Sequence, residues 1–77
     1  MNIKGVKTLT FLIDQDIKFV GEAIENKKNF DELTFNNYII MMKDTLSKRI
    51  EGLKRFSSND KLIAKYNKKV NNLLESL

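Results

Sequence analysis

The sequence predicts an all-α fold: a small three-helix up-down-up bundle, made of a helical hairpin and a C-terminal helix, that associates with itself. Apolar residues recur at coiled-coil-like spacings of three and four along most of the chain, as on one side of a helix. Two polar segments, residues 26–32 and 57–60, interrupt this pattern, and such short connections place consecutive helices antiparallel. There is no proline and the three glycines lie far apart, so residues 1–77 are expected to form one helical domain.

The first helix is expected over about residues 8–28. One face carries residues at alternating spacings of three and four: Ile3, Val6, Thr10, Ile13, Ile17, Val20 and Ile24. Leu9, Leu12, Phe19 and Ala23 widen this face. Gly5 weakens a helix, and the β-branched residues that follow it leave open whether residues 1–12 are helix, strand or disordered. We expect the first seven residues to be frayed or extended.

The second helix, expected over about residues 35–56, organises the fold. Five consecutive apolar residues, Tyr38 to Met42, step around the helix by about 100° each and therefore encircle it. A helix that is apolar all round needs more than one neighbour. Thr34 is the expected N-cap, with Leu33 and Tyr38 forming a hydrophobic staple. The inner face is predicted to comprise Phe35, Ile39, Met42, Leu46, Ile50 and Leu53, with Tyr38 and Phe56 at its margin.

The third helix is expected over about residues 59–76. Ser58 is the predicted cap, and Asp60 lies in the first turn, where the helix dipole favours a negative charge. The inner face of this helix is predicted to be Leu62, Ile63, Tyr66, Val70, Leu73, Leu74 and Leu77.

The composition excludes several classes of protein. There is no cysteine and no histidine, so neither a disulfide nor an ordinary zinc site is expected, and no cofactor is implied. The usual nucleophile–base pairs are also missing, and no glycine-rich phosphate loop is present, so we expect no catalytic residue and no small-molecule substrate. No apolar run approaches the roughly 18 residues of a membrane span, and no signal peptide is visible. The expected location is the cytoplasm.

A chain of 77 residues hides only about 60% of its unfolded surface and is usually marginal alone. We therefore expect a protein partner, or self-association as a homodimer or higher oligomer. Two charges, Asp16 and Arg49, interrupt apolar stripes. Isolated buried charges are costly, so these two are predicted to form a structural ion pair, between the first two helices or across a dimer. The alternative places both at a wet edge of the core.

A partner-binding surface is predicted on the second helix. Ile40 and Met41 fall outside its inner face, and Met41 heads a strip of small residues along one flank. The chain's own third helix could fill this groove, which would give it no function. Alternatively, a helix from another subunit or a target docks there, and methionine suits such adaptable surfaces. The candidate partner-binding residues are Tyr38, Ile40, Met41, Thr45 and Gly52.

A basic patch is the third feature. Between residues 43 and 69, nine basic residues face three acidic ones, whereas the whole chain carries a net charge of +4. Such a patch could follow nucleic-acid phosphates or an acidic protein surface, although no aromatic residues are interleaved for base stacking. Exposed lysine also serves simple solvation. The patch comprises Lys54, Arg55, Lys61, Lys65, Lys68 and Lys69.

The sequence thus predicts a non-catalytic protein-interaction module that acts through an apolar helical surface. A small adaptor, an assembly factor or a stoichiometric inhibitor would have these properties. An inhibitor of this size would suit a phage or another mobile element. The competing hypothesis is a nucleic-acid-binding accessory protein that uses the basic arc of the last helix.

Overall fold

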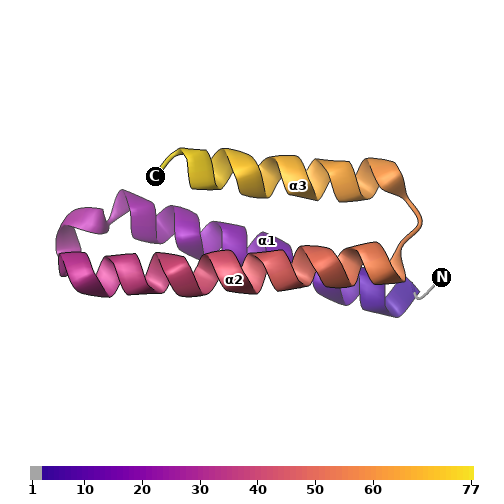
Figure 1. Ribbon diagram of the computed structural model, residues 1–77, viewed down its shortest axis with the longest axis horizontal. Coiled ribbons are helices and arrows are strands. Elements are labelled where there is room, and N and C mark those ends of the chain that lie inside the picture. Colours follow the sequence, from indigo (N-terminus) through magenta and orange to yellow (C-terminus); the bar gives the residue numbers. More distant parts are fainter. Residues whose placement is uncertain (1–2) are drawn as a thin grey trace.

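The computed structural model describes residues 3–77, which fold into three α-helices (Figure 1). α1 (Ile3–Glu25) and α2 (Glu32–Phe56) form an antiparallel hairpin around the short 3₁₀ turn η1 (Lys27–Asn29), and α3 (Asp60–Glu75) returns along the hairpin. Residues 3–77 contain no strand, which confirms the predicted all-α three-helix bundle. The molecule measures 43 × 17 × 15 Å. Within the described residues, no helix has both the length and the apolar character needed to cross a membrane.

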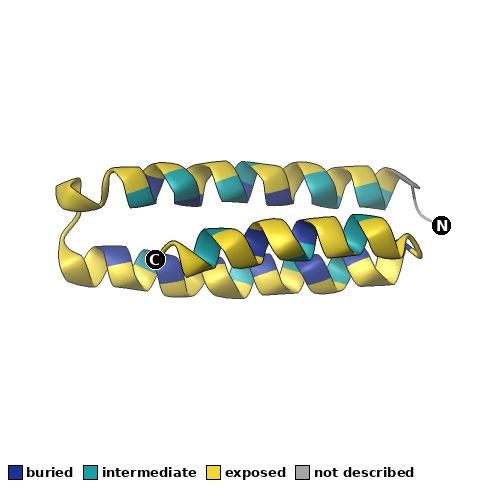
Figure 2. Ribbon diagram, turned by 90° about the horizontal axis from the view of Figure 1, so that it is seen from above, coloured by how far each residue is buried: buried dark blue, intermediate teal, exposed yellow. Residues whose placement is uncertain are grey.

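The core lies along the line where the three helices meet (Figure 2). Ile13 and Leu46 belong to the buried cluster that α3 joins through Tyr66 and Val70. A second cluster, nearer the turn between α1 and α2, contains Val20, Ala23, Phe35, Ile39 and Met42. All six residues predicted for the inner face of α2 are buried, so that prediction is confirmed.

α1 begins at Ile3, five residues earlier than expected, and runs through Gly5. The expectation that the first seven residues are frayed or extended is therefore wrong for residues 3–7. Residues 1–2, to which it also applied, lie outside the described residues. Val6 and Leu9 pack against the buried core, and this packing outweighs the weak helix preference of a single glycine.

The cap of α2 is Asp31 instead of Thr34. The Asp31 side chain accepts a hydrogen bond from the Thr34 backbone N–H at 3.2 Å, and the Thr34 hydroxyl donates to the same carboxylate at 3.3 Å. A carboxylate at this position also interacts favourably with the helix dipole. Leu33 then lies within the helix and is 68% exposed, so the predicted staple with Tyr38 is wrong.

The cap of α3 is one residue later than expected. The Asn59 side chain accepts a hydrogen bond from the Leu62 backbone N–H at 3.2 Å, so Ser58 is not the cap. Ser57 is buried, and its hydroxyl accepts a hydrogen bond from the Asn59 backbone N–H at 3.0 Å. This bond fixes the end of the connection, and the helix starts at Asp60 in consequence.

Two helical glycines differ in what surrounds them, which gives a stability prediction. A Cβ at Gly21 would have no neighbouring atom within 4 Å, whereas one at Gly52 would lie 3.3 Å from Leu9 Cδ1. Because alanine favours a helix over glycine by about 1 kcal/mol, Gly21→Ala is expected to raise the free energy of unfolding by about 0.5–1 kcal/mol. Gly52→Ala should gain less, because Leu9 must move aside. Urea denaturation of both variants checks this; an equal gain for both would contradict the described packing.

Candidate functional site

α3 covers only one side of the α1–α2 hairpin (Figure 2). Asp14 marks that side of α1: its carboxylate accepts a hydrogen bond from the Tyr66 hydroxyl at 3.1 Å and lies 3.7 Å from Lys69 Nζ. Burial, followed by the contact with Asp14, raises the pKa of Tyr66 above its ordinary value. Asp16 lies two residues further along α1 and therefore points about 200° away, to the side that α3 does not cover.

We call this uncovered side the open face. On both helices its residues repeat at spacings of three and four, as a second stripe beside the one that forms the core. Such a double stripe is typical of helices that pack on two sides. All its residues are uncharged except Asp16 and Arg49. The open face comprises Leu12, Asp16 and Phe19 of α1, with Ala23, which also belongs to the core, and Tyr38, Met41, Thr45, Arg49, Gly52 and Phe56 of α2.

An ion pair crosses the middle of the open face. Arg49 Nη1 lies 2.5 Å from Asp16 Oδ2 and also donates to the Leu12 carbonyl at 3.2 Å. The side chains of Arg49 and Asp16 are 28% and 11% exposed. Burial raises the pKa of Asp16 above its ordinary value, and the positive charge of Arg49 opposes this shift. The structure thus brings the two predicted partners together between the first and second helices of one chain.

An aromatic hollow occupies the open face near the turn between α1 and α2. Its volume is about 370 Å³, and its walls include Phe19, Ala23, Phe30 and Tyr38. Phe19 is 49% exposed. Burial, followed by the negative charges of Asp16 and Glu22, raises the pKa of Tyr38.

Four of the five predicted partner-binding residues lie on the open face. Met41 is 54% exposed, while Tyr38 and Thr45 are half-buried. Gly52 is half-buried against Leu9 of α1. The chain's own first helix therefore covers this end of the strip, and the alternative in which the third helix fills the groove does not hold there. The covering helix could not be identified from the sequence because the sequence does not say which side of α2 each neighbour takes.

Ile40, the fifth residue, lies on the opposite flank of α2. It is 66% exposed and borders a different hollow of about 410 Å³, together with Phe35, Lys43 and Leu77. Leu77 follows α3, so Ile40 lies beside the end of the third helix. The structure therefore separates Ile40 from Met41 and from the open face.

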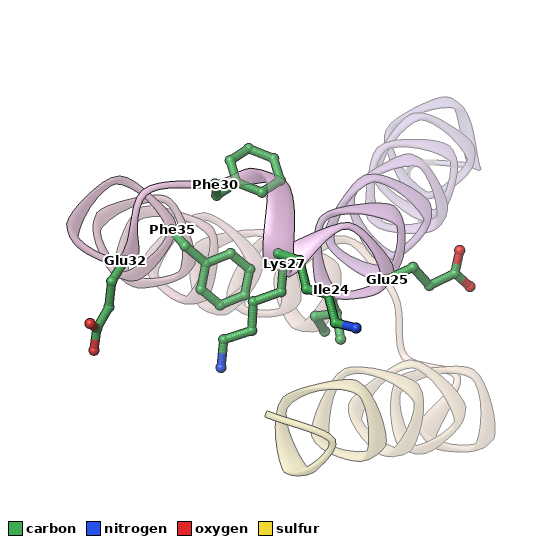
Figure 3. A pocket seen from close by; sticks show the side chains of 7 residues that line it. Ile24, Glu25, Lys27, Phe30, Glu32 and Phe35 are labelled. Carbon is green, nitrogen blue, oxygen red and sulfur yellow. The ribbon is translucent and has the colours of Figure 1, made fainter.

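A further hollow of about 460 Å³ lies at the turn end of the hairpin (Figure 3). α3 stops short of this end, and the turn extends beyond the C-terminus (Figure 1). Phe30 and Phe35 form a tilted ring pair with centroids 6.0 Å apart, and Lys27 Nζ lies 5.4 Å from the Phe35 centroid. This hollow also lies outside the open face, although Phe30 borders both.

The structure divides the predicted basic patch. Lys65 and Lys69 lie over the Tyr66 ring, with Nζ 5.8 and 5.0 Å from its centroid, and Lys69 also approaches Asp14. Lys69 therefore faces α1. Lys54 and Arg55 belong to α2, and Arg55 points about 200° away from the buried Leu53, toward the outer side of that helix. The exposed lysines of α3 that remain in one arc are Lys61, Lys65 and Lys68.

Reasoning from the sequence placed Leu12 and Phe19 in the core-facing side of the first helix. In the structure they are 36% and 49% exposed and belong to the open face. The signal that could have found them is the second stripe of uncharged residues on α1, spaced three and four apart around Asp16. Among residues 3–77, no group of three carboxylates is close enough to hold a metal ion. Comparisons with family models, with curated proteins and with solved structures found no match.

Proposed function

We propose that this protein is a non-catalytic protein-interaction module that binds its partner through the open face. The observation that supports the proposal most is the pattern of exposure: Leu12, Phe19, Met41 and Phe56 are between 36% and 54% exposed on one side of the hairpin. Contiguous apolar surface rimmed by polar residues is typical of protein-binding sites. The chain contains no histidine or cysteine, which is consistent with a role without catalysis.

A small adaptor, an assembly factor or a stoichiometric inhibitor, which a phage or mobile element could encode, would act in this way in the cytoplasm. Each of these roles uses binding energy alone, and large apolar and aromatic side chains supply most of it at interfaces. Phe19 and Met41 are the residues on which we expect binding to depend most, because both are large and about half exposed.

The competing proposal is nucleic-acid binding by Lys61, Lys65 and Lys68. Their positive charge favours it, and such binding would weaken steeply as the salt concentration rises. We rank it second, because Lys65 already contacts Tyr66 and the other basic residues, Lys54 and Arg55, lie on another helix.

Site-specific photo-crosslinking in the source cell tests the proposal. A photoreactive phenylalanine derivative is placed at position 19, at position 40 or at position 68, and adducts are analysed with and without nuclease. We expect a nuclease-resistant protein adduct from position 19, and its yield should fall at least about tenfold when Met41→Lys is added. Position 40 is the matched control, because it is also exposed but lies on the other flank.

Adducts that form only from position 68 and disappear with nuclease would support the nucleic-acid function and overturn the proposal. Adducts from position 40 alone would overturn the choice of the open face. Circular dichroism of each variant shows whether the helices are retained.

A further inference from the structure

We propose that the partner on the open face is a second copy of this chain, related by a two-fold axis that runs parallel to the helices. The proposal rests on the proposed function, because it assumes that the open face binds protein. In this arrangement the turn ends of the two hairpins lie together, and α1 of each copy packs antiparallel against α2 of the other. The result is a four-helix layer between two outer α3 helices.

The ion pair selects this arrangement. Asp16 lies on α1 and Arg49 on α2, side by side in the middle of the open face. A two-fold rotation about an axis between the two helices exchanges their positions, so each Asp16 comes to face an Arg49 of the second copy. Four charges of alternating sign then meet at the centre. Electrostatic complementarity of this kind fixes the register of an interface and disfavours other arrangements.

The arginine has donors left for such contacts. Both described hydrogen bonds of Arg49 use Nη1, to Asp16 Oδ2 and to the Leu12 carbonyl. A guanidinium carries five N–H donors in a planar fork. The remaining N–H groups could therefore reach the second copy's aspartate without breaking the pair within the chain.

The sizes of the flanking side chains agree with the same axis. On α1, the residues four before and three after Asp16 are large, Leu12 and Phe19; on α2, the residues at the same offsets from Arg49 are small, Thr45 and Gly52. Antiparallel packing of α1 on α2 reverses the order, so Phe19 meets Thr45, and Leu12 lies at the level of Gly52, which is already half-buried against Leu9 of its own chain. On the turn side of the charged centre a large side chain then fits against a small one, as close packing requires.

The alternative two-fold axis, which runs perpendicular to the helices, fits the charges and sizes of these side chains less well. It would place α1 against α1 and α2 against α2, so each Asp16 would face an Asp16 and each Arg49 an Arg49. Leu12 would then meet Phe19 while Thr45 met Gly52, which crowds one half of the interface and leaves the other half loosely packed.

Charge on the other side of the molecule also favours the open face. The outer side of α3 carries the exposed Lys61, Lys65 and Lys68, which would repel the same side of a second copy. The open face is therefore the side on which two copies can meet.

A charge swap tests the arrangement. The double variant Asp16→Arg/Arg49→Asp keeps the pair within the chain, so the variant is expected to fold and to dimerise with itself, as measured by sedimentation equilibrium. When it is mixed with wild-type chain, like charges face each other, and mixed dimers should form at least about tenfold less than a random mixture predicts. Native mass spectrometry counts the mixed dimers. Random or preferential mixing would overturn the parallel axis.

Cross-linking keeps the proposal testable if the swapped chain does not fold. The chain has no cysteine, so single cysteines can be introduced one at a time. A Phe19→Cys chain mixed with a Thr45→Cys chain should give the mixed disulfide, whereas Leu12→Cys mixed with Phe19→Cys should not; the reverse result would favour the perpendicular axis.

Oligomeric state separates this inference from the proposed function. A wild-type chain that stays monomeric at every concentration would overturn the self-association. A photo-crosslinked adduct with a different protein from position 19 would still support the open face as the binding surface. If no protein adduct forms from position 19 at all, both fail together.

Discussion

Replacing Arg49 with alanine is expected to lower the free energy of unfolding by about 3 kcal/mol, the lower end of the range for breaking a buried ion pair. The Asp16 side chain is only 11% exposed, so without its partner a negative charge stays in a poorly solvated place. Burial already raises the pKa of Asp16. In the Arg49→Ala chain nothing opposes this shift, and the carboxyl group will take up a proton at a higher pH. Urea denaturation near neutral pH measures the loss.

The matched control is the neighbouring surface pair. Lys48 Nζ lies 3.0 Å from Asp44, but these side chains are 76% and 65% exposed. Exposed pairs one helical turn apart contribute only about 0.3–0.5 kcal/mol, so Lys48→Ala should change stability by less than about 0.5 kcal/mol. The double variant Asp16→Ala/Arg49→Ala should be less destabilised than the sum of the single variants. Additive losses would show that the pair contributes no coupling energy.

Replacing Leu46 with alanine is expected to lower the free energy of unfolding by about 2–5 kcal/mol. Leu46 is fully buried at the centre of the core cluster that joins all three helices. Removing its side chain loses the transfer free energy of the buried atoms and leaves a cavity that the bundle can fill only in part. Such a loss is a large share of the stability of a domain of this size. Urea denaturation measures the loss, and the folded fraction of the variant without urea is determined in the same experiment.

Ile40→Ala is the control for that substitution. The residue also lies in the middle of α2, but it is 66% exposed, so it has few contacts to lose. Alanine is also the better helix former. The expected change is within about 0.5 kcal/mol. If Ile40→Ala and Leu46→Ala destabilised the protein equally, α2 would be rotated relative to its described orientation.

The core of α2 could be predicted from the sequence because a helix has a fixed period. Once residues 35–56 are assigned to a helix, the spacing of Phe35, Ile39, Met42 and the later apolar residues fixes the buried side. The ends of the helices could not be fixed in this way. Asp31, Thr34, Ser58 and Asn59 are all good caps, and the path of the connection decides between them.

The candidate site could be predicted only in part, for a related reason. Met41 and Ile40 were recognisable as residues outside the core, but their neighbours depend on which side of α2 each of the other helices takes. The contacts of Gly52 with Leu9 and of Asp14 with Tyr66 join residues that are 43 and 52 positions apart. The spacing of residues within a single helix does not reveal such contacts. The open face can therefore be identified only when the positions of α1 and α2 relative to each other are known.

Among the described helices, α3 contributes only two buried residues, Tyr66 and Val70, whereas α2 contributes six. The least anchored element of a fold is the one that detaches most cheaply in local opening events. Release of the last helix will therefore cost less free energy than separation of the hairpin. In local opening events we expect the C-terminal helix to detach first, while the other two helices remain packed together.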